Sequence, residues 1–237
     1  MNNILTISKK ELKSYFLSPV AYIVIIGFLL AAGFLFTKDL FLMGVVSIRF
    51  LFESIWFLLL FVFIIPAITM GTFSEEKRSG TMELLLTKPI TDTQLMLGKF
   101  LASLIFAVII IIPTIVYIIS LKYLGAIDLG PVISMYLGFI LLFAFLVSIG
   151  IFTSSLTQYQ VISFIISFLI MAVFFMLYIF TNYIPLLSVP IIDYFNPFIH
   201  MNNMFRGVID SRDLIYFISG TIIFLILTKL SIESRKW

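Results

Sequence analysis

The chain has 237 residues, of which 62% are hydrophobic and 11% are charged, with a formal net charge of +3 and a mean hydropathy of +1.19. A soluble domain carries roughly 25% charged residues, so this composition excludes an ordinary soluble domain and predicts a protein surrounded largely by lipid. The chain contains no cysteine, which excludes disulfide bonds and thiolate metal sites.

The N-terminal segment, MNNILTISKKELKSYF, lacks the apolar region and the small-residue cleavage site of a signal peptide. Drawn as a helix, it places apolar residues on one side, namely Ile4, Leu5, Leu12, Tyr15 and Phe16, and lysines mainly on the other. We therefore predict that residues 1–18 form an interfacial helix that turns Lys9, Lys10 and Lys13 toward anionic lipid. A simple basic flank of the first span is the alternative. Pro19 is expected to end this helix.

Six apolar segments follow, because about 20 apolar residues are needed for a helix to cross a membrane. The predicted spans are Val20–Thr37, Ser54–Gly71, Phe100–Leu121, two crossings within Leu129–Ile192, and Leu214–Thr228. The polar sequence TSSLTQYQ, Thr153–Gln160, is predicted to form the turn between the fourth and fifth spans. The fold class that we expect is an all-α polytopic membrane protein with one transmembrane domain over residues 1–237.

The distribution of lysine and arginine predicts the orientation of these spans. With both termini in the cytoplasm, the inner segments carry ten basic residues and the outer segments five, whereas the acidic residues divide six and six. We therefore place both termini, and the loop after the second span, in the cytoplasm.

That loop contains a charged stretch, FSEEKRSGTMELLLTKP, between two apolar spans. Glu75 to Arg78 are expected to extend the second span as a helix, and Ser79-Gly80 to end it. A short amphipathic helix is predicted after Thr81, and Thr91–Gln94 fits a capping box that opens the next helix. Since a simple reversal needs about four to six residues, we interpret residues 73–93 as a docking surface for a cytoplasmic partner. A solvated loop whose leucines lie on the membrane is the alternative.

The sequence FSEEKRSGTMELLLTKPITDTQLMLGK resembles the stretch after the second span of ABC-2 type transporter permeases. In that family the segment contains the coupling helix, which contacts the ATPase subunit. The resemblance implies that the contact here is made by Glu75, Glu76, Lys77, Arg78, Gly80, Thr81, Glu83 and Leu84. Met82 and Leu85 complete the expected contact as the apolar face of the short helix.

Three further stretches, GIFTSSLTQYQ, RGVIDSRDLIYF and LTKLSIESRKW, resemble the gliding-motility-associated (Gld-type) ABC permease subunit. The resemblance implies the permease subunit of an ATP-driven exporter in the bacterial inner membrane, which couples ATP hydrolysis to export or force transfer and is linked to gliding motility. The implied partners are two copies of an ATPase subunit that hold ATP and Mg²⁺, a second permease copy as homodimer or heterodimer, and an auxiliary membrane protein with an extracytoplasmic domain.

The same resemblance implies an extracytoplasmic helical element before the last span, at Ser188–Asp213.

Two other functions stay open at this point, namely an ion-coupled secondary carrier and a membrane scaffold of an envelope or motility machine. The spans contain no charged residue in their cores, whereas ion-coupled carriers usually keep an ionisable group there. This weakens the carrier alternative.

Other sequence features indicate no chemistry of the chain's own. There is no G-x-x-x-x-G-K-[ST] phosphate loop, so we expect neither an enzyme nor a bound cofactor. His200 is the only histidine, and we expect a polar surface residue there, although Asp193 and Asp210 are near enough in sequence to suggest a metal. Small and polar residues of spans four and five are predicted to pack closely against neighbouring helices, within the subunit or across a dimer interface: Gly138, Ser148, Gly150, Ser154, Ser163 and Ser167.

Overall fold

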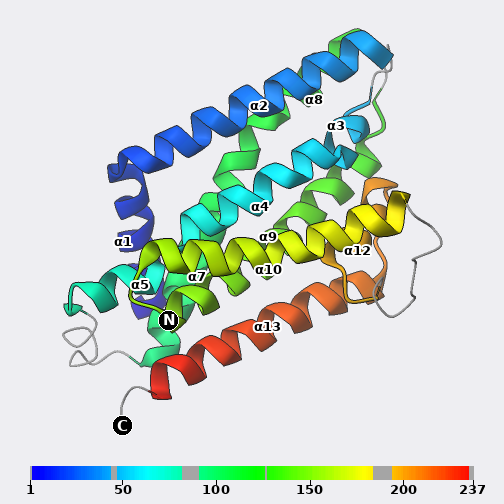
Figure 1. Cartoon of the computed structure of the whole chain (residues 1–237). Helices are drawn as coiled ribbons and strands as arrows, with labels where there is room; N and C mark the ends of the chain where they lie inside the picture. Colours follow the sequence, from blue (N-terminus) through cyan, green and yellow to red (C-terminus); the bar gives the residue numbers. More distant parts are fainter. Residues whose placement is uncertain (1, 44–46, 82–90, 126, 184–193, 235–237) are drawn as a thin grey trace.

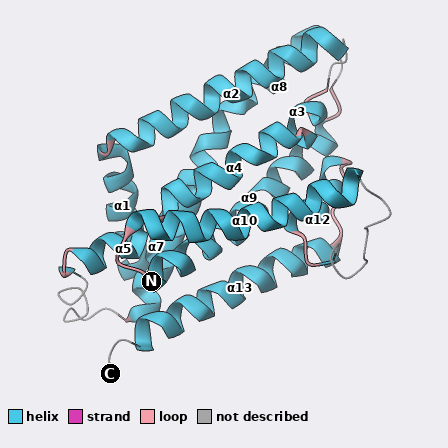
Figure 2. Cartoon of the chain, viewed as in Figure 1, coloured by secondary structure: helices cyan, strands magenta, loops and turns pink. Residues whose placement is uncertain are grey.

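The structure is a computed structural model that describes residues 2–43, 47–81, 91–125, 127–183 and 194–234 (Figure 1). Throughout these ranges the regular elements are helices, and no strand occurs among them (Figure 2). The predicted all-α class is therefore confirmed.

Within the part of the chain that the structure describes, six helical segments are long and apolar enough to cross a membrane. They are α2 (Pro19–Met43), α4 (Ile55–Thr69) continued by α5 (Gly71–Arg78), α7 (Asp92–Ile111) continued by α8 (Ile115–Leu124), α9 (Leu129–Leu156), α10 (Gln160–Tyr183) and α13 (Ser211–Glu233). A 3₁₀ turn, η1 (Ile112–Thr114), joins α7 to α8 at Pro113, because proline removes a helical hydrogen bond. The predicted number of spans is confirmed.

Three shorter helices complete the described fold: α1 (Asn2–Leu17), α3 (Arg49–Glu53) and α12 (Pro197–Phe205). An even number of spans brings both chain ends to one side, and Figure 1 shows α1, α5 and both termini at the same end of the bundle. We call this the terminal end. The opposite end, where α3 and α12 lie, is called the distal end.

The central helix is α9, which contacts α4, α5, α7, α10, α12 and α13. Two of its glycines permit this close packing. A Cβ atom at Gly138 would lie 2.6 Å from the sulfur of Met204 in α12, and one at Gly150 would overlap the side chain of Thr69 in α4. The small residues of α9 thus serve packing within the subunit, one of the two predicted roles.

Local sequence signals locate several helix ends correctly. α1 ends at Leu17 and α2 begins at Pro19. Thr91 forms the expected capping box, because its hydroxyl accepts a hydrogen bond from the backbone N–H of Gln94. After α5, Gly80 has a φ of +70°, a left-handed conformation that glycine adopts without strain and that commonly ends helices.

The predicted turn at Thr153–Gln160 is partly wrong, because α9 continues to Leu156 and only three residues, 157–159, separate it from α10. The polar side chains are accommodated inside the helix. Thr153 donates to the carbonyl of Gly150 at 2.8 Å, and Ser155 donates to the carbonyl of Phe152 at 2.7 Å. Hydroxyls that bond to their own helix in this way do not end it.

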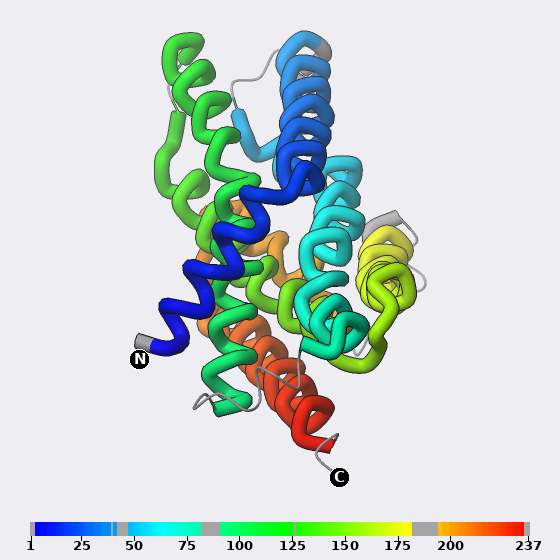
Figure 3. Tube along the Cα trace, turned by 90° about the vertical axis from the view of Figure 1, so that its left-hand side faces the viewer, coloured from blue at the N-terminus to red at the C-terminus, as the bar shows by residue number. Residues whose placement is uncertain are grey.

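Figure 3 shows α1 lying obliquely across α7. Ile4, Leu12, Tyr15 and Phe16 are partly buried, as their predicted common face requires. Leu5, however, is 62% exposed. The buried stripe is completed by Ile7, Ser8 and Glu11, since positions three and four apart share a helix face, and Leu5 lies outside that stripe.

Candidate functional site

The junction between α4 and α5 is held by a serine from another span. The first N–H groups of any helix have no partner within that helix, and the residue before α5, Met70, offers no side-chain cap. Ser154 of α9 supplies the missing acceptor, because its Oγ accepts from the N–H groups of Phe73 at 3.0 Å and Ser74 at 3.1 Å. The same hydroxyl donates to the carbonyl of Met70 at 3.0 Å. The start of α5 is thereby fixed to the end of α9.

A second connection joins α5 to the last turn of α9. Lys77 donates from Nζ to the carbonyl of Ser155, and Ser231 of α13 donates to the same carbonyl at 3.1 Å. The last carbonyls of a helix lack partners within the helix and attract cations. The α9 terminus is therefore the point where α5 and α13 meet.

A buried lysine connects α5 to two further helices. The side chain of Lys99 in α7 is only 1% exposed, and its Nζ lies 2.8 Å from Glu76 Oε1 in α5 and 3.3 Å from Glu11 Oε1 in α1. It also donates to the carbonyl of Thr72 at 2.7 Å. An ammonium group has three donors, and here all three have acceptors. We call Lys99, Glu11 and Glu76 the Lys99 cluster.

The environment of the Lys99 cluster makes its pairing important. Lys99 Nζ lies 5.2 Å from the centroid of the Phe73 ring, which is itself fully buried. A charge removed from water is costly unless it is paired, and loss of one partner of a buried ion pair costs about 3–5 kcal/mol. The relative positions of α1, α5 and α7 are thus coupled through one cation.

Close packing of α1 on α7 brings Glu11 within reach of Lys99. A Cβ atom at Gly98 would lie 2.7 Å from Ile7 Cβ, so only glycine allows this approach. Further along α1, the hydroxyl of Tyr15 lies 2.9 Å from Ser103 Oγ and donates to the carbonyl of Ile68 at 3.3 Å. Burial raises the pKa of Tyr15, which keeps this hydroxyl protonated as a donor.

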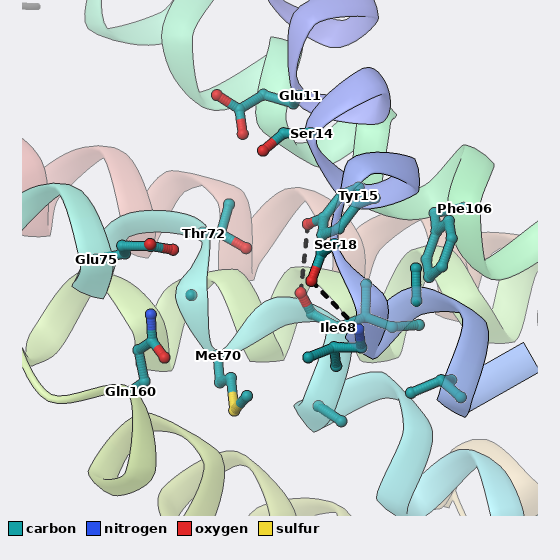
Figure 4. Close-up of a pocket in the computed structure, with 15 residues that line it drawn as sticks. Glu11, Ser14, Tyr15, Ser18, Ile68, Met70, Thr72, Glu75, Phe106 and Gln160 are labelled. Atoms are coloured by element: carbon teal, nitrogen blue, oxygen red, sulfur yellow. Dashed lines mark hydrogen bonds between the residues drawn. The ribbon is translucent and has the colours of Figure 1, made fainter. Parts of the chain in front are cut away.

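A cavity of about 190 Å³ lies between α1, α2 and the α4–α5 junction (Figure 4). Its apolar wall includes Ile68 and Phe106, and its polar residues include Glu75 and Gln160. A second hollow of about 430 Å³ shares Glu75 with the first and extends to Lys99, Ser79 and Thr81. These spaces lie between parts of α1 and α5, and the Lys99 cluster joins the two helices beside them.

Comparison with known proteins assigns the chain to a family. Residues 46–230 match the family described as ABC-2 family transporter protein. The chain belongs to this family. It is therefore a multi-pass membrane component of an ABC-2 transporter, and the matched range covers Glu76, Lys99 and Ser154 but not Glu11. No curated protein matches the chain.

Within this ABC-2 family chain, the predicted ATPase-contact residues divide into three sets. Glu75, Arg78, Gly80 and Thr81 are exposed at the terminal end. Glu76 and Lys77 point into the protein and hold the partners given above. The remaining predicted contacts lie outside the described residues: Met82, Glu83, Leu84 and Leu85.

The predicted membrane-interface residues, Lys9, Lys10 and Lys13, are exposed on α1. They lie away from the stripe that packs on α7. The orientation of α1 relative to lipid stays a prediction.

Glu11, Lys99 and Ser154 belong to the site although no sequence motif predicted them there. Their partners are 23 to 88 residues away along the chain, so no local motif joins them. One signal was available, namely a lysine eight positions into the otherwise apolar helix that opens at Asp92, because such a charge needs a partner.

The expectation for His200 as a surface residue is wrong. Its side chain is 11% exposed and its Nδ1 lies 2.6 Å from Asp213 Oδ1. Asp210 instead caps α13 by accepting from the N–H of Arg212 at 2.9 Å, and Asp193 lies outside the described residues. Among the residues that the structure describes, no three potential metal ligands come together.

Proposed function

We propose that the chain is the permease subunit of an ATP-driven ABC-2 exporter whose movements originate in a separate ATPase. The observation that carries the proposal is the set of contacts around α5. One helix that ends in exposed charge is connected to α9 through Ser154, to α13 through Ser155, and to α1 and α7 through Lys99. A displacement of α5 would therefore reach three spans and the N-terminal helix together.

In this proposal the terminal end of the bundle faces the cytoplasm of a bacterial cell, in its inner membrane. The excess of basic residues in the segments at that end supports this orientation. The ATPase then meets the exposed residues Glu75, Arg78 and Thr81 together with the short apolar helix expected in residues 82–86. Two ATPase copies, which hold ATP and Mg²⁺, act on two permease copies.

The transmission route depends on the contacts of α5 with its neighbours. Ser154 and Lys77 fix α5 against α9, and Lys99 joins α5 to α1 and α7. Closure of the ATPase dimer would move α5, and Lys99 would carry α1 and α7 with it. The resemblance to the Gld-type subunit supports a link to gliding motility and an auxiliary membrane protein as a further partner.

An ion-coupled carrier or a scaffold without transport fits the contacts less well. The charged side chains that the structure pairs, on α1, α5, α7, α12 and α13, lie at the two ends of the bundle. An ion-coupled carrier usually keeps such groups at mid-membrane depth. A scaffold needs no connection of α5 to so many spans.

The experiment is co-purification of the ATPase with variants of the chain, followed by measurement of ATP hydrolysis in nanodiscs. Leu84→Asp and Leu85→Asp should release the ATPase, because buried apolar residues carry most binding energy at an interface. Lys99→Met should retain the ATPase but lose the hydrolysis that the permease stimulates, while Lys122→Met, which changes an exposed lysine, should match the wild type. Wild-type stoichiometry and wild-type hydrolysis in all of these variants would overturn the proposal.

A further inference from the structure

The cavity between α1, α2 and the α4–α5 junction has a polar end and an apolar end. Val24 of α2 and Ala67 and Ile68 of α4 line its apolar part. Glu75 lies beyond the end of α4 and Gln160 is the first residue of α10, and Figure 4 shows these two side chains together on one side of the cavity. The lining therefore changes from polar at the terminal end of the bundle to apolar toward the middle of the spans.

Two diverging spans leave this space open. Phe28 of α2 packs on Phe61 of α4, with the ring centroids 5.5 Å apart. Nearer the terminal end, Val24 and Ala67 border the cavity instead. Val20 also lines the cavity and is 49% exposed. The cavity thus reaches the outer face of α2, where lipid surrounds a membrane span.

The polar end carries negative charge. Glu11 and Glu75 line the cavity, and none of the described residues around it is a lysine, an arginine or a histidine. Glu11 is paired with Lys99, whereas Glu75 pairs with none of the basic residues that the structure describes. A Cβ atom at Gly71 would lie 3.4 Å from Glu75 Oε2 and 3.6 Å from Gln160 Nε2, so a carboxylate and an amide meet at the start of α5. This end suits a cation that donates hydrogen bonds.

We propose that the cavity binds phosphatidylethanolamine from the leaflet at the terminal end. Its ammonium group donates to Glu75, and the first carbons of an acyl chain lie along Val24 and Ile68. Between them, the hydroxyl of Ser18 accepts from the N–H of Val20 at 3.3 Å and keeps its own hydrogen for the phosphate. The inference does not depend on the proposed coupling to an ATPase.

The choice of this lipid follows from charge and shape together. Phosphatidylglycerol carries the same phosphate without a cation, so its charge would meet Glu11 and Glu75 unbalanced. A basic side chain of a partner protein would suit the carboxylates, and Glu75 is exposed enough for one to reach it. Such a side chain, arriving from water, would leave the apolar wall and the opening beside Val20 unused.

Because the chain has no cysteine, one introduced thiol reports on the cavity alone. Ser14→Cys places it in the lining, and Leu17→Cys places it at a residue that is 73% exposed and does not line the cavity. With the purified full chain in detergent, added phosphatidylethanolamine should slow alkylation of Ser14→Cys several-fold and leave Leu17→Cys unchanged. Equal slowing at both positions, or at neither, would overturn the proposed site. Protection of Ser14→Cys by the ATPase but by no lipid would assign the cavity to the partner protein instead.

Lipids with identical acyl chains isolate the contribution of the amine. Phosphatidylglycerol should give no protection at Ser14→Cys. Phosphatidylcholine, whose quaternary nitrogen has no N–H to donate, should protect less than phosphatidylethanolamine. Protection by phosphatidylglycerol equal to that by phosphatidylethanolamine would contradict recognition of the amine.

Substitutions added to Ser14→Cys assign the binding to the two ends of the cavity. Glu75→Gln should raise the amount of phosphatidylethanolamine needed for half protection by about two- to fivefold, the range for an ion pair open to water. Glu233→Gln removes the same charge from α13, where the side chain is 43% exposed, and should leave that amount unchanged. Ala67→Leu fills the apolar part and should abolish protection. Equal results for the two glutamate variants, or full protection in Ala67→Leu, would show that the lipid does not bind in this cavity as proposed.

Discussion

At the terminal end one cation, Lys99, pairs with two carboxylates. At the distal end one carboxylate, Asp213, contacts a histidine and an amide side chain. Lys99 joins three helices through two carboxylates, whereas the pair of His200 and Asp213 joins two helices that follow each other along the chain. The Lys99 cluster therefore connects α1, α5 and α7 across long stretches of sequence and is suited to transmitting movement. The pair of His200 and Asp213 connects α12 to α13.

The two ends also differ in what surrounds the charged groups. α5 borders a cavity, whereas α12 buries most of its apolar side chains in the bundle, among them Phe198, Met201, Met204 and Phe205. Loss of the ion contacts should thus free the terminal end more than the distal end. The following changes test that difference, beginning with the largest expected effect.

Lys99→Met should be the most damaging of these substitutions. It leaves the carboxylates of Glu11 and Glu76 near each other without a cation, and breaking such a buried arrangement costs about 3–5 kcal/mol. The measurement is the free energy of unfolding in detergent, followed by tryptophan fluorescence, with Lys122→Met as the control.

The double variant Glu76→Gln/Lys99→Met sharpens this test. Removal of both partners should cost clearly less than the sum of the two single changes, because the double variant lacks the unpaired carboxylate of Glu76 that Lys99→Met leaves behind, although Glu11 stays without its cation. Additive losses would mean that Glu76 and Lys99 do not interact in the folded protein.

Gly98→Ala tests the approach of α1 to α7. Alanine is the better helix former by roughly 0.5–1 kcal/mol, yet its Cβ would lie 2.7 Å from Ile7 Cβ and force α1 away. We expect a net loss of about 1–3 kcal/mol from this overpacking, together with faster hydrogen exchange in α1. Gly27→Ala is the matched control, since no atom lies within 4 Å of its added Cβ; it should be neutral or stabilising.

Ser154→Ala should weaken the start of α5. The N–H groups of Phe73 and Ser74 lose their acceptor, and loss of a helix cap costs about 0.5–2 kcal/mol. Ser155→Ala is the control, because that hydroxyl bonds only within α9. If hydrogen exchange in α5 is equal in the two variants, Ser154 does not cap this helix.

What the sequence predicts well is local in origin. The six spans follow from runs of apolar residues, the end of α1 from Pro19, and the start of α7 from the spacing of Thr91 and Gln94. Each of these signals depends on side chains within a few residues of the backbone that they affect.

What the sequence does not predict depends on contacts between distant segments. Lys99 finds its carboxylates in α1 and α5, Ser154 caps a helix 80 residues earlier, and His200 is paired with a residue of the next helix. In the sequence, a serine such as Ser154 looks the same whether it lies in a turn or caps the buried start of a helix. Only the packing of the helices distinguishes these roles.

The most direct test of the central claim is a distance between spin labels on α1 and α5 in the complex with the ATPase. Because the chain has no cysteine, Lys13→Cys and Ser79→Cys place the labels at two exposed positions. If α5 passes its movement to α1 through Lys99, this distance should stay the same between the ATP-bound and nucleotide-free states, and should change between them once Lys99→Met is added. A distance that changes with nucleotide by the same amount with and without Lys99 would contradict the account.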